Sequence, residues 1–293
     1  MVAIALWRRW LNGGAPPNVN ELQNPACFLE DARDRFLSYS WTYVQNVAML
    51  LWPSKLCADW TTPGEHLVVG LGAENQGRLA AIACFYLGLP AFGLWSLLGA
   101  SKPRALAGFA LAWAAVTFGM SANVLQCVGF VLAERVLYLP SFGACLLAAL
   151  ALSAAAGAAP PPSRRTALAA LAGPLVLLAG AKCWAQDAAW RGPIELWGHA
   201  YSVNPRGVLV AEEYGSALSR ADMHEEAIPV LRYAHEEISV PHSRKYMPCY
   251  HMSVSLMKTG RAAAAREALG GCLALSDALV AEKLAAAAEA GER

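Results

Sequence analysis

Charged side chains are scarce in this chain. Only 15% of its 293 residues are Asp, Glu, Lys or Arg, whereas soluble domains usually contain about 25%. The formal net charge is +1, which excludes the strongly basic surface typical of nucleic-acid-binding proteins. Hydrophobic residues reach 56%, and few charges fall between residues 79 and 181. We therefore predict an all-α membrane protein with a multi-pass helix bundle and water-exposed segments on both sides.

Several chemical signatures are also missing. The six histidines show no metal-ligand spacing, and the eight cysteines include no Cys-x-x-Cys pair, so we expect neither a metal site nor a cofactor. Gly70, Gly72 and Gly77 lack the spacing and the preceding strand of a dinucleotide fingerprint. No Asn-x-Ser/Thr acceptor occurs, so we expect no N-linked sugar.

The cysteines allow two interpretations. Cys84, Cys127 and Cys145 lie in or beside apolar runs, and we expect them to be packing residues. Cys27 and Cys57 share the N-terminal flank and are candidates for a disulfide in an oxidising compartment. The sequence alone leaves that pairing open.

Four apolar runs are candidate membrane spans: Leu79–Gly99, Ala105–Met120, Leu139–Ala159 and Thr166–Trp184. A spanning helix needs about 20 apolar residues, so the second run is short or continues into its loop. Buried helices of a large soluble protein are the alternative. Four nearly charge-free runs in succession favour the membrane, and we assign residues 79–184 to four transmembrane helices.

Basic residues in two loops predict the orientation of these helices. Lys102 and Arg104 separate the first two runs, and Arg164 and Arg165 separate the last two. The positive-inside rule places both loops in the cytoplasm. The N-terminal flank, the loop that contains Glu134 and everything after residue 184 then share the opposite side.

The N-terminal flank, residues 1–78, is rich in turn formers. Within it Trp41–Cys57 is too polar to span easily and has aromatics at both ends, which suits an interfacial or re-entrant helix that ends near Pro53. A spanning helix is the alternative. Met1–Leu11 matches neither a membrane span nor a signal peptide, so we expect either a missing upstream part or a short natural N-terminus.

Residues 185–293 predict a tetratricopeptide-repeat helical solenoid. One repeat register is followed by a second about 38 residues later, with Val240–Lys245 as an inserted linker and Ala278–Ala290 as a capping helix. An ordinary helical bundle is the alternative. The first register uses Tyr214, Gly215, Leu218, Ala227, Leu231 and Ala234, and the second uses Met252, Ser253, Leu256, Gly260, Ala265, Leu269 and Cys272.

Glu134 and Arg135 stand side by side between two apolar runs. Ionisable groups at a membrane edge are costly and usually functional. The pair has two interpretations: a grip on a charged lipid head group, or an interfacial ion pair that orients a loop.

Longer motifs carry a family resemblance. Arg9–Gly14, Asn24-Pro25-Ala26, Leu50–Trp60 and Val128–Gly143 occur in this order, and the repeats follow. The strings Glu-Arg-Val-Leu-Tyr-Leu-Pro-Ser and Leu-Cys-x-Asp-Trp are the most specific. Together they resemble the transmembrane and tetratricopeptide repeat-containing family over nearly the whole chain.

The resemblance implies a protein O-mannosyltransferase of the endoplasmic reticulum membrane with lumenal repeats. Such an enzyme moves mannose from dolichyl phosphate mannose to Ser or Thr of cadherin-type domains. The resemblance also implies that the Arg135 guanidinium binds the donor phosphate and that Glu134 orients Arg135 or a nearby group. Tyr138 and Asn123 are expected at the same rim.

One departure concerns the general base. Enzymes of this architecture carry acidic residues in the first lumenal loop, and no matching motif is present, so the catalytic residues are unknown. Asp59 is the best local carboxylate, and its first interpretation is structural. Two functions remain open: an O-mannosyltransferase or part of one, and a non-catalytic membrane scaffold whose repeats bind secretory clients or chaperones.

Overall fold

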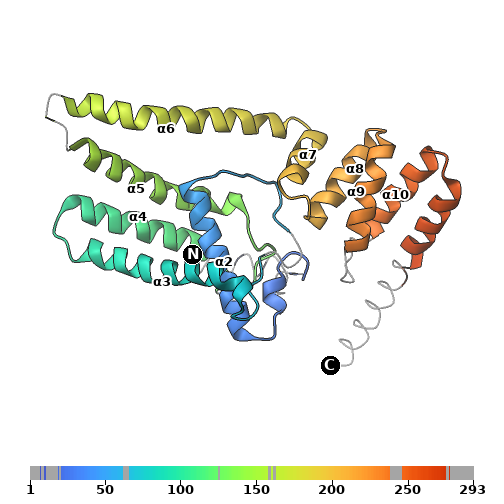
Figure 1. The fold of residues 1–293 in the computed structure, drawn as a ribbon, viewed down its shortest axis with the longest axis horizontal. Coiled ribbons are helices and arrows are strands. Elements are labelled where there is room, and N and C mark those ends of the chain that lie inside the picture. The colour runs from blue at the N-terminus through green and yellow to red at the C-terminus, as the bar shows by residue number, and fades with distance from the viewer. Residues whose placement is uncertain are drawn as a thin grey trace.

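The computed structural model describes residues 21–61, 66–124, 126–157, 163–237 and 246–274, with isolated positions 7, 10, 19, 160 and 277. Its regular elements are all helices, and no β-strand occurs within these ranges, which confirms the all-α prediction. Figure 1 shows a set of long helices side by side, with a group of shorter helices at one end of them. The elements therefore form a long-helix bundle and a separate short-helix unit.

Three of the described helical segments are long and apolar enough to cross a membrane: Ala73–Leu97, Glu134–Gly157 and Arg164–Trp190. They contain the helices α3 (Gln76–Leu97), α5 (Tyr138–Gly157) and α6 (Arg164–Asp187). At most 17% of the most apolar window of any of these segments is buried inside the protein. Such exposed apolar helices are stable where lipid covers them.

The predicted second span forms α4 (Lys102–Gly119), an 18-residue helix. It does not reach the hydropathy of a membrane span because its first turn contains Lys102, Pro103 and Arg104. At 1.5 Å per residue the helix is about 27 Å long. It packs between α3 and α5 (Figure 1), so its membrane crossing remains a prediction that rests on its neighbours.

Small residues let α4 and α5 approach closely. Ala110 is fully buried, and a Cβ on Gly143 would collide with the backbone oxygen of Ala110. Between apolar helices in lipid, such small contacts replace the hydrophobic driving force that water supplies elsewhere. The Gly143 position therefore fixes the spacing of the two helices.

The chain alternates in direction through α3, α4, α5 and α6. At the end of the bundle farthest from the short helices, α3 and α5 end and α4 and α6 begin (Figure 1). Lys102 and Arg104 begin α4, and Arg164 and Arg165 begin α6. The four basic residues thus lie at one end of the bundle, and the short helices lie at the other end, which we call the repeat-facing end.

Helix α2 (Ala32–Leu51) crosses the repeat-facing end at a steep angle to α3 and α5 (Figure 1). It begins well before the expected Trp41 because the Asp31 side chain accepts a hydrogen bond from the Arg33 amide at 2.7 Å and caps the first turn. It ends at Leu51, before Pro53, as the missing amide of proline requires. A short 3-10 helix, η1 (Pro25–Phe28), precedes it.

The short-helix unit begins after η5 (Ala188–Trp190) and contains α7 (Pro193–Val203), α8 (Val208–Arg220), α9 (His224–Glu237) and α10 (Tyr246–Lys258). Residues 262–274 form a further helix. Asp222 and Gly260 have positive φ angles of 60° and 76° at turns that lie 38 positions apart. The two helix pairs therefore repeat with the offset that the sequence predicts.

Packing within the pairs follows the predicted small and large positions. Ala227 and Leu231 are fully buried, and Leu218 is 1% exposed. A Cβ on Gly215 would lie only 2.6 Å from Leu231 Cγ, so α8 and α9 meet at this glycine. One expected core residue, Leu269, is instead 43% exposed. The expected linker Val240–Lys245, the capping helix Ala278–Ala290 and most of Met1–Leu11 lie outside the described residues.

Candidate functional site

The predicted site residues gather at the repeat-facing end of the bundle. Glu134 and Arg135 begin the 3-10 helix η3 (Glu134–Leu137), and Tyr138 is the first residue of α5. This short helix connects the loop after α4 to the membrane helix α5. The pattern of an acid and a base before an apolar run thus marks the point where a membrane helix begins.

Glu134 does not pair with Arg135. Its Oε1 accepts a hydrogen bond from the Cys57 amide at 2.6 Å and another from the Trp60 indole nitrogen at 3.1 Å. Both donors belong to the Leu-Cys-x-Asp-Trp string, 77 and 74 residues earlier in the chain. The two most specific motifs of the sequence therefore contact one another through this carboxylate.

Arg135 makes a different contact. Its guanidinium carbon lies 5.2 Å from the centroid of the Phe130 ring, a cation–π distance. The side chain is exposed and makes no ion pair within the described part of the chain. An arginine placed this way keeps its N–H groups available for an external anion such as phosphate.

Tyr138 and Asp59 differ in their surroundings. Tyr138 is 81% exposed at the start of α5. The Asp59 carboxylate accepts the Thr61 amide at 2.7 Å, and its backbone oxygen accepts the Cys57 thiol at 2.9 Å. Asp59 thus stabilises a local turn, a geometry that agrees with its structural interpretation.

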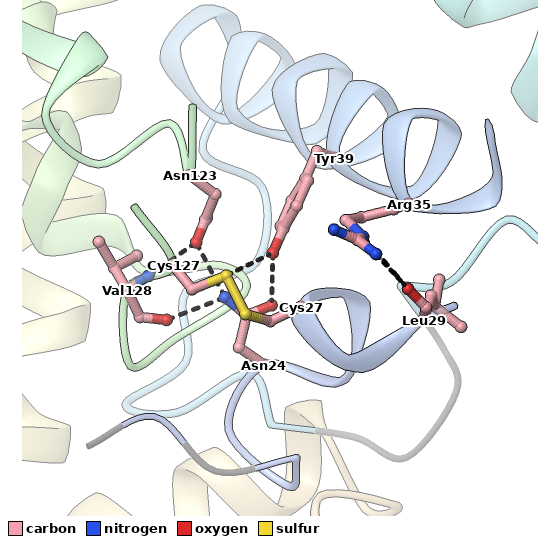
Figure 2. The surroundings of a disulfide bond; sticks show 8 residues. All are labelled: Asn24, Cys27, Leu29, Arg35, Tyr39, Asn123, Cys127 and Val128. Carbon is pink, nitrogen blue, oxygen red and sulfur yellow. Dashed lines mark hydrogen bonds between the residues drawn. A yellow bond between two sulfur atoms is a disulfide. The ribbon is translucent and has the colours of Figure 1, made fainter. Parts of the chain in front are cut away.

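Asn123 holds a loop. It adopts a φ of 56°, a left-handed conformation that Asn tolerates better than most residues. Figure 2 shows its Oδ1 accepting hydrogen bonds from the Asn24 side chain at 2.8 Å and from the Val128 amide at 2.9 Å. Asn24 is fully buried and also donates to the Val128 oxygen at 2.9 Å. The residue expected at the rim of a substrate site therefore shapes the loop between α4 and η3.

A disulfide between Cys27 and Cys127 fastens the same loop (Figure 2). The Tyr39 hydroxyl of α2 lies 3.4 Å from Asn24 Oδ1 and 3.7 Å from Cys127 Sγ. The Arg35 guanidinium donates to the Leu29 oxygen at 2.7 Å and supports the turn between η1 and α2. The N-terminal flank and the loop after α4 are thus held together by covalent and polar contacts, and we call the group Asn24, Cys27, Tyr39, Asn123 and Cys127 the clamp.

This disulfide corrects two interpretations of the cysteines. Cys127 is a disulfide partner rather than a packing residue, and Cys27 pairs with it instead of with Cys57. Cys57 is a free, buried thiol, and its burial raises its pKa to about 11. Cys249 and Cys272 form a second disulfide, within the short-helix unit.

An apolar cavity of about 350 Å³ opens beside η3. It lies between α2, α3, α4 and α5 at the repeat-facing end. Leu137 and Pro140, which follow Arg135 by two and five residues in the chain, line this cavity. Its walls are almost entirely hydrocarbon, with contributions from Tyr43, Val47, Phe85, Leu111 and Phe118.

Glu134 thus accepts hydrogen bonds from the segment that contains Asp59. Arg135 and Tyr138 are exposed, and Asn123 belongs to the clamp. Sequence reasoning missed Trp60 as the partner of Glu134 and Asn24 as the partner of Asn123. Both residues lie in the family motifs Leu50–Trp60 and Asn24-Pro25-Ala26. Their presence in these motifs was the signal that could have identified them as contact residues. No group of three potential metal ligands occurs in the described ranges.

Comparison with known proteins places these motifs in a family. The family model "Protein O-mannosyl-transferase TMTC, DUF1736" matches residues 13–90. The mouse protein O-mannosyl-transferase TMTC4 is 31% identical over 228 residues, which cover 78% of this chain and 30% of the mouse protein. Mouse protein O-mannosyl-transferase TMTC1 is 32% identical over 236 residues, which cover 80% of this chain and 24% of that protein.

A fly relative gives the same result. The Drosophila melanogaster protein O-mannosyl-transferase Tmtc3 is 29% identical over 233 residues, which cover 80% of this chain and 25% of the fly protein. No solved structure matches the chain. The chain spans about a third or less of the length of these relatives. The two most specific strings, Glu-Arg-Val-Leu-Tyr-Leu-Pro-Ser and Leu-Cys-x-Asp-Trp, contact one another at Glu134. By its similarity to these relatives, the chain belongs to the TMTC family of transmembrane and tetratricopeptide repeat-containing proteins.

Proposed function

We propose that this chain forms the donor-lipid-binding part of a protein O-mannosyltransferase. The reaction moves mannose from dolichyl phosphate mannose to Ser or Thr of secretory acceptors such as cadherin-type domains. Relatives that carry the name protein O-mannosyl-transferase support the reaction class. The donor and the acceptor class are part of the proposal.

The observation that carries the proposal is the combination of Arg135 with the apolar cavity. A lipid phosphate needs a cation at the membrane surface and an apolar path for its hydrocarbon chain. Arg135 supplies an exposed guanidinium, whose planar fork suits phosphate oxygens. Leu137 and Pro140, two and five residues further along the chain, line the cavity. In the proposal, Arg135 binds the head group of a lipid whose hydrocarbon chain enters this cavity.

Glu134 supports this role of Arg135 indirectly. Its carboxylate already accepts two hydrogen bonds from Cys57 and Trp60. It therefore leaves the Arg135 charge without an internal counter-ion among the described residues. Tyr138, exposed one turn further along, adds a hydroxyl at the same face for a sugar or a phosphate.

The two disulfides support a lumenal position for the site and for α7–α10. Disulfides persist in oxidising compartments such as the endoplasmic reticulum lumen. Cys27–Cys127 lies at the repeat-facing end of the bundle, and Cys249–Cys272 lies within the short-helix unit. The basic residues of the α3–α4 and α5–α6 turns lie at the opposite end, which suits the cytoplasmic face.

In this proposal, the short-helix unit binds the acceptor protein. Its two helix pairs repeat with a 38-residue offset, and tetratricopeptide repeats arranged in this way form extended concave binding surfaces. We assign residues 185–293 to such repeats, residues 79–184 to the membrane domain and residues 1–78 to the lumenal flank. The acceptor would then approach the membrane site from the repeats.

The test is binding of dolichyl phosphate, the donor's lipid portion, to the purified chain in detergent. Arg135→Ala should weaken binding about 10- to 150-fold, because a hydrogen bond to a charged group contributes about 1.5–3 kcal/mol. Ala115→Phe, which narrows the cavity, should also weaken it. Arg104→Ala, at the far end of the bundle, is the matched control and should bind as the unchanged chain does. Equal binding by the Arg135 and Arg104 variants would refute the site.

A non-catalytic scaffold is the second candidate, and the acidic residues favour it. Glu134 accepts two N–H groups, Asp59 caps its own turn, and Asp34 accepts the Gly70 amide at 3.1 Å. None of these three carboxylates is placed as a free general base. Mannose transfer to a cadherin domain by the chain alone would reject the scaffold. Donor binding without transfer would indicate that a general base comes from elsewhere.

A further inference from the structure

Residues 54–61 form an irregular segment that follows α2, and we call it the strap. Its first contact is with the membrane bundle. The amide of Cys57 and the indole nitrogen of Trp60 both donate to Glu134 Oε1, at 2.6 and 3.1 Å. One carboxylate oxygen of η3 thus anchors both the middle and the far part of the strap.

The strap's second contact is with α7 of the short-helix unit. His199 Nε2 donates to the Leu56 oxygen at 3.2 Å. The Cys57 thiol approaches the Ala200 oxygen at 3.6 Å, and the Asn204 side chain donates to the Asp59 oxygen at 3.4 Å. These three contacts join positions more than 140 residues apart in the chain.

Apolar packing reinforces the same contact. Cys57, Ala200 and Val210 form a buried cluster, in which Ala200 and Val210 are fully buried. Trp60 and Trp197 pack against this cluster from the strap and from α7. The strap therefore fills a joint between η3 on one side and α7 and α8 on the other.

The joint affects the orientation of the short-helix unit, because the covalent connection between that unit and the bundle is short. Helix α6 leads through η5 and the residues Arg191 and Gly192 into α7. A single two-residue connection leaves rotation about its backbone bonds, and glycine restricts that rotation least. A second attachment far from the first removes this freedom, since two separated contacts define an orientation.

We infer that the strap fixes the orientation of the short-helix unit relative to the membrane end of η3, with Glu134 as its positioning residue. Glu134 acts through Cys57 and Trp60 rather than on any substrate. The repeats are thereby held at a constant distance from the exposed face that contains Arg135. This inference concerns the geometry of the chain and stands whether or not the chain binds a donor lipid.

Cys57 provides a direct measurement. Cys57 is 6% exposed with the strap docked, and burial raises the pKa of its thiol to about 11, which slows its reaction further. The other free cysteines are Cys84, Cys145 and Cys183, and all three are replaced by Ala in the test protein. The rate at which a water-soluble maleimide then modifies Cys57, in the full chain within phospholipid nanodiscs, reports opening of the strap.

Glu134→Ala should raise this rate about tenfold or more, because two buried N–H donors lose their acceptor. Glu134→Gln keeps an accepting oxygen and should label within about threefold of the unchanged chain. His199→Ala, on the opposite side of the joint, should also accelerate labelling. Lys55→Ala is the matched control: Lys55 lies in the strap with an exposed side chain and makes no hydrogen bond or ion pair within the described ranges.

Hydrogen exchange in the same samples tests whether the strap separates from α7. Glu134→Ala should increase amide exchange in residues 54–61 and at the start of α7, while α2 and α9 keep their protection. Protection of α2 and α9 also shows that the variant remains folded. Trp60→Phe removes one of the two donors to Glu134 and keeps an aromatic ring, so it is a milder variant for the same test. Unchanged Cys57 labelling in Glu134→Ala would overturn the inference. Acceleration by Glu134→Ala without any effect of His199→Ala would overturn the claim that the strap holds the repeats.

Discussion

Loss of the Cys27–Cys127 disulfide should destabilise the repeat-facing end of the bundle. The bond closes a loop of 100 residues, for which the chain-entropy relation gives about 4.7 kcal/mol. Helices α3 and α4 lie within that loop, and in the predicted membrane arrangement both remain inserted after the end unfolds. They shorten its free length to roughly half, and each halving removes about 0.6 kcal/mol. We therefore expect Cys27→Ala to lower the free energy of unfolding of this end by about 4 kcal/mol.

The assay is thermal unfolding of the full chain in detergent, followed by intrinsic tryptophan fluorescence, with hydrogen exchange to locate the change. Exchange should rise in η1, in the first half of α2 and in the loop of residues 120–133. Peptide mapping without reduction should recover a peptide that joins Cys27 to Cys127. Asn24→Ala, which removes three side-chain hydrogen bonds from the same clamp, should shift exchange at the same places by a smaller amount.

Cys249→Ala is the matched control, because it removes the other disulfide and leaves the clamp intact. It should raise exchange in α10 and in residues 262–274 without affecting α2. The reasoning would be refuted if Cys27→Ala left both melting and exchange unchanged. A peptide that joins Cys27 to Cys57 would refute the structural basis as well.

Three further predictions concern packing and pH. Ala227→Leu should overpack the contact of α8 with α9 and lower the free energy of unfolding of that pair by about 1–3 kcal/mol. Hydrogen exchange in α8 and α9 measures this change, and unchanged exchange would disprove the repeat register. Gly143→Val should separate α4 from α5 at Ala110 and lower the melting temperature in detergent, whereas Gly157→Ala, where a Cβ meets nothing, should not. Burial and then the Arg220 charge lower the pKa of His251 below its ordinary 6.5. The unfolded state therefore takes up the proton first, stability should fall as the pH drops below about 6.5, and melting curves of His251→Gln should show a flatter dependence there.

The strap and the clamp together explain why the site is formed by segments distant in sequence. The clamp joins the N-terminal flank to the loop before η3, and the strap joins the same flank to η3 and α7. Arg135 directly follows Glu134 in η3. The clamp and the strap therefore both fix the segment that contains Arg135.

The sequence alone determined the helices and their order. The predicted runs 79–99, 139–159 and 166–184 correspond to α3, α5 and α6 within a few residues at most ends. Hydropathy over about 20 residues is a local property, so it can be read without knowledge of the fold. The offset of 38 residues was equally readable, because the two registers place their turns at Asp222 and Gly260.

Only the tertiary structure decided which residues meet. Glu134 stands beside Arg135 in the chain, yet its partners are Cys57 and Trp60, and Cys27 bonds to Cys127 instead of the nearer Cys57. Both results follow from α2 crossing the ends of α3, α4 and α5. The crossing is set by close packing of side chains from all of these helices, and packing geometry depends on contacts between distant segments that no local pattern records.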